Sequence, residues 1–459
     1  MDYDLAIIGS GSGNSLVTPH FDDWRIAIIE ESTFGGTCLN VGCIPTKMFV
    51  YPADLATGTR EAARLGVDAH VDRVRWADMR DRIFGRIDAI SEGGLNYRKR
   101  GSEAHNTTLY ETHAAFADPH TLTLGTGQSI TAERIVIAAG SRAVVPDVVR
   151  HSGVPYYTSD TVMRIDAVPR RVAILGGGYI AAEFAHIFES FGAETTIVLR
   201  GDKLAKHLDP DIGHAFTEVL RRRVDVRFGY HLSGLHVEPG ADGDAICMRL
   251  DDGSRFETDL LLVATGRKPN GDRLKAAAAG VELHPDGRVK VDAQQRTCVP
   301  HIWALGDVSS EYQLKHVANH EARVVAHNLA HPHDPIESDH RFVPSAVFTS
   351  PQLASVGLTE REAEARGISY VTAIEHYGET AYGWAMEDTT SMCKLLANPN
   401  TGQLIGAHLM GEQAATLIQP LIQAMSFGLD VRAMARGQYW IHPALTEVVE
   451  NALLKLPIR

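Results

Sequence analysis

The chain has 459 residues, well above the ~250–300 residues at which one hydrophobic core tends to divide, so we expect three or four structural units. With 44% hydrophobic and 22% charged residues it is not a disordered chain, and no run approaches the ~18 apolar residues of a membrane span. The net charge of −13 disfavours a nucleic-acid or anionic-membrane partner, and five cysteines in so long a chain do not form a disulfide scaffold.

The N-terminal segment predicts a nucleotide-binding βαβ unit. Acidic residues pass at once into a strand-like run, so we expect no signal peptide and a soluble, cytoplasmic protein. An apolar strand over residues 4–9 ends in a glycine cluster, and a helix over 14–21 and a second strand over 26–29 are expected to follow.

The glycine cluster, Gly-Ser-Gly-Ser-Gly-Asn over residues 9–14, matches G-x-G-x-x-G at its first two glycines. Gly9 permits the tight turn, and Gly11 lets the backbone approach a pyrophosphate. Asn14 stands at the third position, which predicts a looser contact between helix and strand. Glu30 ends the second strand, where an acid binds ribose hydroxyls.

Two cysteines follow in the stretch 34–47, with the spacing C-x-x-x-x-C. In a regular helix, residues five apart rise ~7.5 Å, whereas the Cα atoms of a disulfide lie roughly 4.4–6.8 Å apart. A bridge between Cys38 and Cys43 therefore needs a distorted turn, which Gly42 can supply. No second pair has zinc-ligand spacing, so no metal is expected; two unrelated buried thiols remain the alternative.

The strand–glycine pattern recurs later in the chain. The strand at 172–175 leads into Gly-Gly-Gly-Tyr-Ile-Ala, a G-x-G-x-x-A loop over 176–181, and a second strand covers 195–199. That strand is followed by Arg200, with Lys206 nearby, instead of an acid. A guanidinium binds a 2′-phosphate, so the residues predict NADPH; a solvated surface cluster is the alternative.

Further repeats predict the domain organisation. The apolar runs at 135–140 and 261–266 resemble each other, and 302–307 reads as a return to the first domain. We expect an α/β protein with two Rossmann-like domains, the second inserted in the first, and a C-terminal α+β unit. The expected boundaries are 1–145 for the first part of the first domain, 146–267 for the second domain, 268–343 for the return, and 344–459 for the last unit.

Near the C-terminus, residues 439–447 read Tyr-Trp-Ile-His-Pro-Ala-Leu-Thr-Glu. Pro443 suits the first position of a helix expected over 444–454, with His442 at its start and Glu447 about one turn on. An imidazole exchanges protons near neutral pH, and a carboxylate orients it. The pair is therefore a candidate acid–base dyad.

The cysteine segment 34–47 resembles the active-site signature of the class I pyridine nucleotide–disulfide oxidoreductases, and the resemblance covers essentially the whole chain. It implies FAD in the first domain, NADPH in the second, and dimerisation through the third. It also implies that Cys38 attacks the substrate disulfide while Cys43 lies next to the flavin. Lys47 would lie near the flavin and pair with Glu183.

The same resemblance implies the nucleotide-binding residues. FAD is expected at Gly9, Gly11, Ser12, Glu30, Thr37, Gly140, Arg267 and Asp307. NADPH is expected at Gly176, Gly178, Tyr179, Ile180, Arg200, Lys206 and Gly266, with Tyr179 covering the nicotinamide pocket. His442 and Glu447 resemble a dyad that this family donates across a two-fold interface, which implies a homodimer.

The substrate is expected to be a small disulfide. Segments 9–15, 381–389 and 437–442 are most similar to the branch of the family that reduces mycothione, the disulfide of the neutral thiol mycothiol. The expected helix over 14–21 contains no Lys or Arg that would bind the carboxylates of glutathione. The alternatives are a dihydrolipoamide dehydrogenase or glutathione reductase-like activity, and a non-catalytic flavoprotein or redox sensor.

Overall fold

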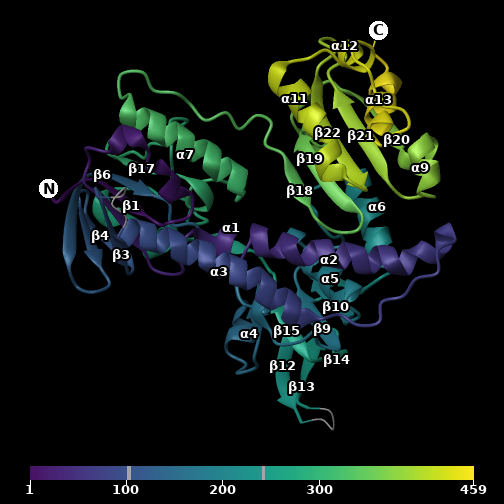
Figure 1. Cartoon of the computed structure of the whole chain (residues 1–459), viewed down its shortest axis with the longest axis horizontal. Helices are drawn as coiled ribbons and strands as arrows, with labels where there is room; N and C mark the ends of the chain where they lie inside the picture. The colour runs from purple at the N-terminus through teal and green to yellow at the C-terminus, as the bar shows by residue number, and fades with distance from the viewer. Residues whose placement is uncertain (101–104, 240–242, 459) are drawn as a thin grey trace.

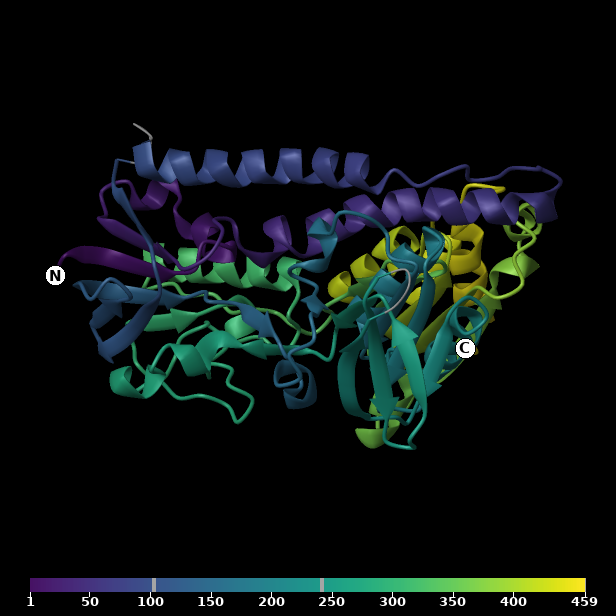
Figure 2. The same ribbon diagram turned by 90° about the horizontal axis from the view of Figure 1, so that it is seen from below.

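The computed structural model describes residues 1–100, 105–239 and 243–458 and shows a mixed α/β chain of three units (Figure 1). The first unit lies at the left with the N-terminus, the second at the bottom, and the third at the upper right with the C-terminus. Two long helices, α2 (Cys43–Glu61) and α3 (Trp76–Arg100), run along the upper side of the molecule in Figure 2.

The first unit is built on a seven-stranded sheet in the order β3-β2-β1-β6-β5-β4, with β17 paired to β6. Its strands are β1 (Tyr3–Ile8), β2 (Ile26–Glu30), β3 (Thr107–Glu111), β4 (Ala114–Asp118), β5 (Thr121–Leu124), β6 (Ser129–Ile137) and β17 (Ile302–Ala304). Strand β17 runs parallel to β6 with Ile302 beside Ile135, so the predicted return of the chain to the first sheet is confirmed. Helix α7 (Lys315–Ala330) covers one face of this sheet.

The predicted helix over 14–21 is wrong. The first glycine loop leads instead into two short 3₁₀ turns, η1 (Ser12–Leu16) and η2 (Pro19–Phe21). Thr18 lies between them in an extended conformation. A residue before proline is disfavoured from the α region, so Pro19 prevents a continuous helix.

The second unit has a parallel five-stranded sheet in the order β11-β10-β9-β15-β8. Its strands are β8 (Tyr157–Thr158), β9 (Arg171–Leu175), β10 (Glu194–Leu199), β11 (Asp225–Phe228) and β15 (Leu260–Val263), with helices α4 (Asp147–Arg150), α5 (Tyr179–Ser190) and α6 (Pro210–Leu220). A three-stranded antiparallel sheet consists of β12 (Leu232–Glu238), β13 (Ala245–Leu250) and β14 (Arg255–Thr258). Where the chain enters and leaves this unit, β7 (Ser141–Ala143) pairs with β16 (Arg267–Pro269).

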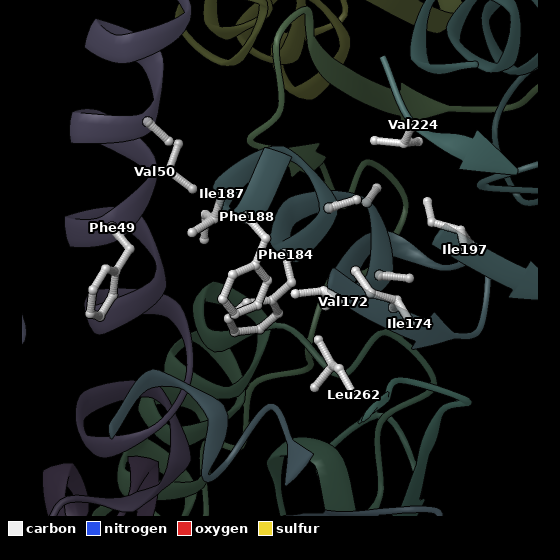
Figure 3. Packing of buried hydrophobic residues seen from close by; sticks show 14 of the residues in the cluster. Phe49, Val50, Val172, Ile174, Phe184, Ile187, Phe188, Ile197, Val224 and Leu262 are labelled. Carbon is white, nitrogen blue, oxygen red and sulfur yellow. The ribbon is translucent and has the colours of Figure 1, made fainter. Parts of the chain in front are cut away.

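Helix α2 joins the first unit to the second through a hydrophobic core. Val50 points from α2 toward Ile187 and Phe188 of α5 (Figure 3), and the Phe49 ring stacks on Trp76 with ring centroids 4.5 Å apart. All five side chains are at most 4% exposed. This packing fixes the start of α2, and hence Cys43, relative to the start of α5.

The third unit is the α+β unit that the sequence predicts. Its antiparallel sheet, β18-β19-β22-β21-β20, consists of β18 (Ser345–Val347), β19 (Gln352–Gly357), β20 (Val371–His376), β21 (Met392–Ala397) and β22 (Leu404–Gly411). Its helices are α8 (Glu360–Ala365), α9 (Ala381–Ala385), α10 (Ala414–Leu417), α11 (Gln419–Phe427), α12 (Val431–Arg436) and α13 (Thr446–Lys455). None of the helices in the described residues has the length and apolarity required to cross a bilayer.

Two prolines shape the helices of this unit. Residues 414–427 form two helices, α10 and α11, that are separated at Ile418, because Pro420 has no N–H to donate to the preceding turn. The helix expected from residue 444 begins at Thr446, and Pro443 follows a cis peptide bond outside it. The Ala444 amide donates to Glu447 Oε2 at 3.4 Å, so a side chain organises this non-helical turn.

Candidate active site

The two active-site cysteines lie on either side of a break between helices. Cys38 belongs to α1 (Gly36–Asn40), and Cys43 is the first residue of α2. Between them, Gly42 has φ −129° and ψ −121°, far from helical values, so the predicted distorted turn is confirmed. A Cβ on Gly42 would lie 2.9 Å from the Thr37 carbonyl oxygen, so this turn requires glycine.

The two thiols are in contact and differ electrostatically. A hydrogen bond from Cys38 to Cys43 lowers the pKa of Cys43 to about 7, against the effect of burial, and the charge of Lys47 lowers it further. The same hydrogen bond, together with burial and the negative charge of Cys43, raises the pKa of Cys38. In the dithiol state the proton therefore stays on Cys38 while Cys43 becomes the thiolate.

Lys47 and Glu183 form an ion pair beside Cys43. Lys47 lies one turn after Cys43 on α2, and its Nζ donates to both Glu183 oxygens at 2.6 and 2.7 Å. Glu183 lies on α5 and is 4% exposed. The backbone amide of Phe348, in the third unit, also donates to this carboxylate at 3.0 Å, and the Phe348 ring centroid lies 4.6 Å from Lys47 Nζ. Phe348 has no sequence signal that could have identified it.

The backbone of the first glycine loop packs closely against two other segments of the chain, at Gly36 and at Ala138. A Cβ on Gly36 would lie 2.6 Å from the Gly11 Cα, and one on Gly9, whose φ is +107°, 2.3 Å from the Ala138 carbonyl oxygen. At Gly140 a Cβ would meet no atom within 4 Å, so the backbone there faces open space. A closely packed glycine loop with open space beside it is the arrangement that a bound FAD needs, so these residues fit the cofactor that the family implies.

Glu30 ends β2 as predicted and is 8% exposed. The amide and hydroxyl of Ser10 donate to its Oε2, and those of Ser32 donate to its Oε1. A carboxylate has about four lone-pair sites, so a ribose diol can bind only where a serine hydroxyl turns away.

Arg267 and Asp307 meet through Ser141. Ser141 Oγ donates to Asp307 Oδ2 at 2.7 Å and accepts from Arg267 Nε at 2.9 Å. Arg267 also forms an ion pair with Asp160 at 3.1 Å, and only 7% of its side chain is exposed. The structure thus brings Arg267 and Asp307 together, with the guanidinium already paired.

The second glycine loop leads into α5, a helix of 12 residues. A Cβ on Gly176, whose φ is +125°, would lie 2.2 Å from the Ala264 carbonyl oxygen, whereas at Gly178 and at Gly266 it would meet nothing within 4 Å. Open space at these two glycines fits bound NADPH. Ile180 is half-buried in the first turn of the helix.

Tyr179 opens α5 and faces the cysteine site. Although the side chain is 39% exposed, protein atoms desolvate its hydroxyl and raise the pKa of Tyr179 to about 12. The charges of Arg267, Asp307, Glu183 and Cys43 act on this hydroxyl, so the residue lies between the second loop and the thiols.

Arg200 follows β10 directly, and both Arg200 and Lys206 are exposed. Neither side chain forms a hydrogen bond or ion pair to another described residue. Their charges are therefore available to a phosphate group.

His442 and Glu447 form a hydrogen-bonded pair, with Nδ1 and Oε1 at 2.5 Å. The His442 side chain is 70% exposed, and within the described chain no hydrogen bond or ion pair joins it to either cysteine. Among the described residues, a single chain thus brings Cys38, Cys43, Lys47 and Glu183 together but gives His442 and Glu447 no polar contact with the cysteines.

Comparison with known proteins places the chain in a family. Residues 3–322 match the model of the pyridine nucleotide-disulphide oxidoreductases, and residues 343–453 match their dimerisation domain. Mycothione reductases of two Mycobacterium tuberculosis strains are 54% identical over 99% of both chains. A glutathione reductase of Burkholderia cepacia is 32% identical over 97% of both.

Among solved structures, the HOCl-induced flavoprotein disulfide reductase RclA from Escherichia coli superposes with a TM-score of 0.85. It is 26% identical, with 98% of this chain and 99% of that chain covered. The chain belongs to the pyridine nucleotide-disulphide oxidoreductase family.

Proposed function

We propose that this enzyme reduces mycothione to mycothiol with NADPH, using a Cys38–Cys43 disulfide as the redox relay. Its cofactors are FAD and NADPH, and its substrate is a small-molecule disulfide. The observation that carries the proposed chemistry is the pair of contacting thiols with opposite pKa shifts beside the Lys47–Glu183 ion pair.

The cofactors are proposed to bind at the two glycine loops. FAD bound there would supply the two-electron chemistry that links NADPH to the Cys38–Cys43 disulfide, and the disulfide would accept two electrons and two protons, one of them from solvent, to give two thiols. The FAD contacts are assigned to Gly9, Gly11, Ser12, Glu30, Thr37, Gly140, Arg267 and Asp307. The NADPH contacts are assigned to Gly176, Gly178, Tyr179, Ile180, Arg200, Lys206 and Gly266, with Arg200 and Lys206 at the 2′-phosphate.

The thiols then reduce the substrate in two exchange steps. The Cys38 sulfur attacks one sulfur of the substrate disulfide, forms a mixed disulfide and expels the first thiolate, which takes a proton from His442. The Cys43 thiolate next attacks the Cys38 sulfur, reforms the Cys38–Cys43 bond and releases the second thiolate. The second thiolate takes up a proton from solvent, to which Cys43 had released its own, so two electrons and two protons yield two thiol products.

Cys38 needs a base, because its raised pKa keeps it protonated until it attacks. The chain forms a homodimer, and we assign this base to His442 of the second copy, oriented by Glu447. The apolar side chains near His442 support an interface there, since Tyr439 is fully exposed and Ile441 is 75% exposed.

The substrate assignment rests on the mycothione reductases that are 54% identical over nearly the whole chain. The segment 14–21 offers no Lys or Arg to a charged peptide, and Asp22 and Asp23 follow it. These residues fit a neutral, sugar-rich thiol such as mycothiol.

The test is an NADPH-oxidation assay of the FAD-loaded enzyme with mycothione, glutathione disulfide and lipoamide, repeated with NADH. We expect turnover of mycothione and a preference for NADPH. Turnover of glutathione disulfide or lipoamide with little turnover of mycothione would overturn the substrate assignment. A clear preference for NADH would overturn the role of Arg200.

A further inference from the structure

The two glycine loops lead into different kinds of helix. The second loop leads into α5, whose N-terminus carries the partial positive charge that binds a pyrophosphate. The first loop leads only into η1, a 3₁₀ segment of five residues. Too few peptide dipoles are aligned behind the first loop to supply the same charge. A pyrophosphate at the first loop must therefore be neutralised by another source.

Two cations that have no carboxylate partner among the described residues adjoin this loop. Arg98, near the end of α3, donates from Nε to Asn14 Oδ1 at 2.9 Å and from Nη2 to the Asn14 carbonyl at 3.4 Å. Lys315, the first residue of α7, donates from Nζ to Ser12 Oγ at 2.8 Å. Neither residue forms an ion pair with any part of the chain that the structure describes.

Arg98 is the more informative of the two because it is only 9% exposed. A buried charge is costly unless an opposite charge compensates for it, and here, among the described residues, Arg98 contacts only the neutral oxygens of Asn14 and the ring of Tyr97, whose centroid lies 5.2 Å from its Cζ. The guanidinium has five N–H donors, and the Asn14 contacts engage only some of them. Asn14, which replaces the third glycine of the motif, is thus the residue that holds Arg98 at the loop.

Lys315 connects the loop to the thiols. Its ammonium contacts Ser12, and its positive charge acts on Cys38, so it lies between the loop and the cysteine pair. FAD bound at the first loop would bring two phosphate charges to the loop, and Lys315 would be one of the cations available to neutralise them.

We propose that Arg98 and Lys315 bind the pyrophosphate of FAD electrostatically, in place of the helix N-terminus that the first loop lacks. This inference rests on the proposed binding of FAD at the first loop. It assigns a role to two residues that lie outside the glycine motif and that no sequence signal marks.

The test measures FAD retention by the purified holoenzyme rather than activity. Free FAD is determined by its fluorescence after dilution at increasing KCl concentrations, for the wild type and for Arg98→Met and Lys315→Met. A charge-assisted hydrogen bond contributes enough that each variant should bind FAD about tenfold or more weakly. Because salt screens charge, the affinity of each variant should also depend less on KCl than that of the wild type.

Matched control variants distinguish the loss of a positive charge at the loop from the loss of side-chain packing. Lys315→Arg keeps the charge and should retain FAD, and Arg222→Met, which removes an exposed cation elsewhere, should behave as the wild type. Unchanged FAD retention in either Met variant would overturn the role of that residue. Weaker binding with an unchanged salt dependence would also overturn it, because the loss would then come from packing. A wild type that holds no FAD would instead overturn the proposed function itself.

Discussion

Cys38 and Cys43 are chemically identical side chains that hold their protons very differently. Cys43 has its thiolate stabilised by a hydrogen bond from Cys38 and by the charge of Lys47, whereas Cys38 is half-buried beside a negative neighbour. The difference in proton affinity between the two thiols therefore follows from position alone. In the proposed mechanism, Cys38 is the attacking thiol, and its raised pKa is the reason that it needs an external base.

The contribution of Cys38 to the Cys43 thiolate can be measured directly. In the reduced holoenzyme, alkylation of Cys43 should rise with a midpoint near its pKa of about 7. Cys38→Ala removes the hydrogen bond that favours the anion, so the midpoint should move to higher pH. Alkylation mapped by mass spectrometry over a pH series checks this. Cys298→Ala, which removes an exposed thiol elsewhere, should leave the midpoint unchanged; a shift there, or none in Cys38→Ala, would contradict the account.

At the scale of elements, the break between α1 and α2 places the two thiols in contact. Gly42→Ala would put a Cβ 2.9 Å from the Thr37 carbonyl oxygen and force the turn to move. We expect destabilisation of roughly 1–3 kcal/mol, seen as a lower Tm, together with weaker coupling between the thiols.

Gly58→Ala on the same helix is the matched control for Gly42→Ala. A Cβ on Gly58 would meet no atom within 4 Å. Alanine is favoured over glycine in a helix interior by about 1 kcal/mol, so this variant should be as stable as the wild type or more so. If the two variants shift the Tm equally, the Gly42 turn is not the sensitive element.

The elements also show how far the sequence could predict the structure. Strands such as β1, β9 and β17 were predictable because short apolar runs end in glycines, and the Gly42 turn followed from disulfide geometry. The helix after the first loop was not, because the effect of Pro19 on Thr18 outweighed the motif. Contacts such as Arg98 with Asn14 join residues far apart in the chain, and no local pattern marks them.

For the whole molecule, the described part of one chain brings together the thiols but leaves His442 exposed and without a polar contact to them. If the partner completes each site, His442→Ala should lower disulfide turnover by about 10²-fold or more. Reduction of the cysteine pair by NADPH should be unaffected, because that step uses residues of one chain. Stopped-flow measurement of the two half-reactions separates these effects.

Mixed dimers test where His442 acts. When Cys38→Ser chains and His442→Ala chains are co-expressed with different tags, the purified heterodimer should regain activity, because one of its sites combines an intact cysteine pair with an intact His442 from the other chain. The wild type paired with the double variant Cys38→Ser/His442→Ala should instead be nearly inactive, since neither site then holds both groups. If His442 served its own chain, the two results would be reversed. Each active site would then use the His442 of its own chain, and the two sites of the dimer would be independent.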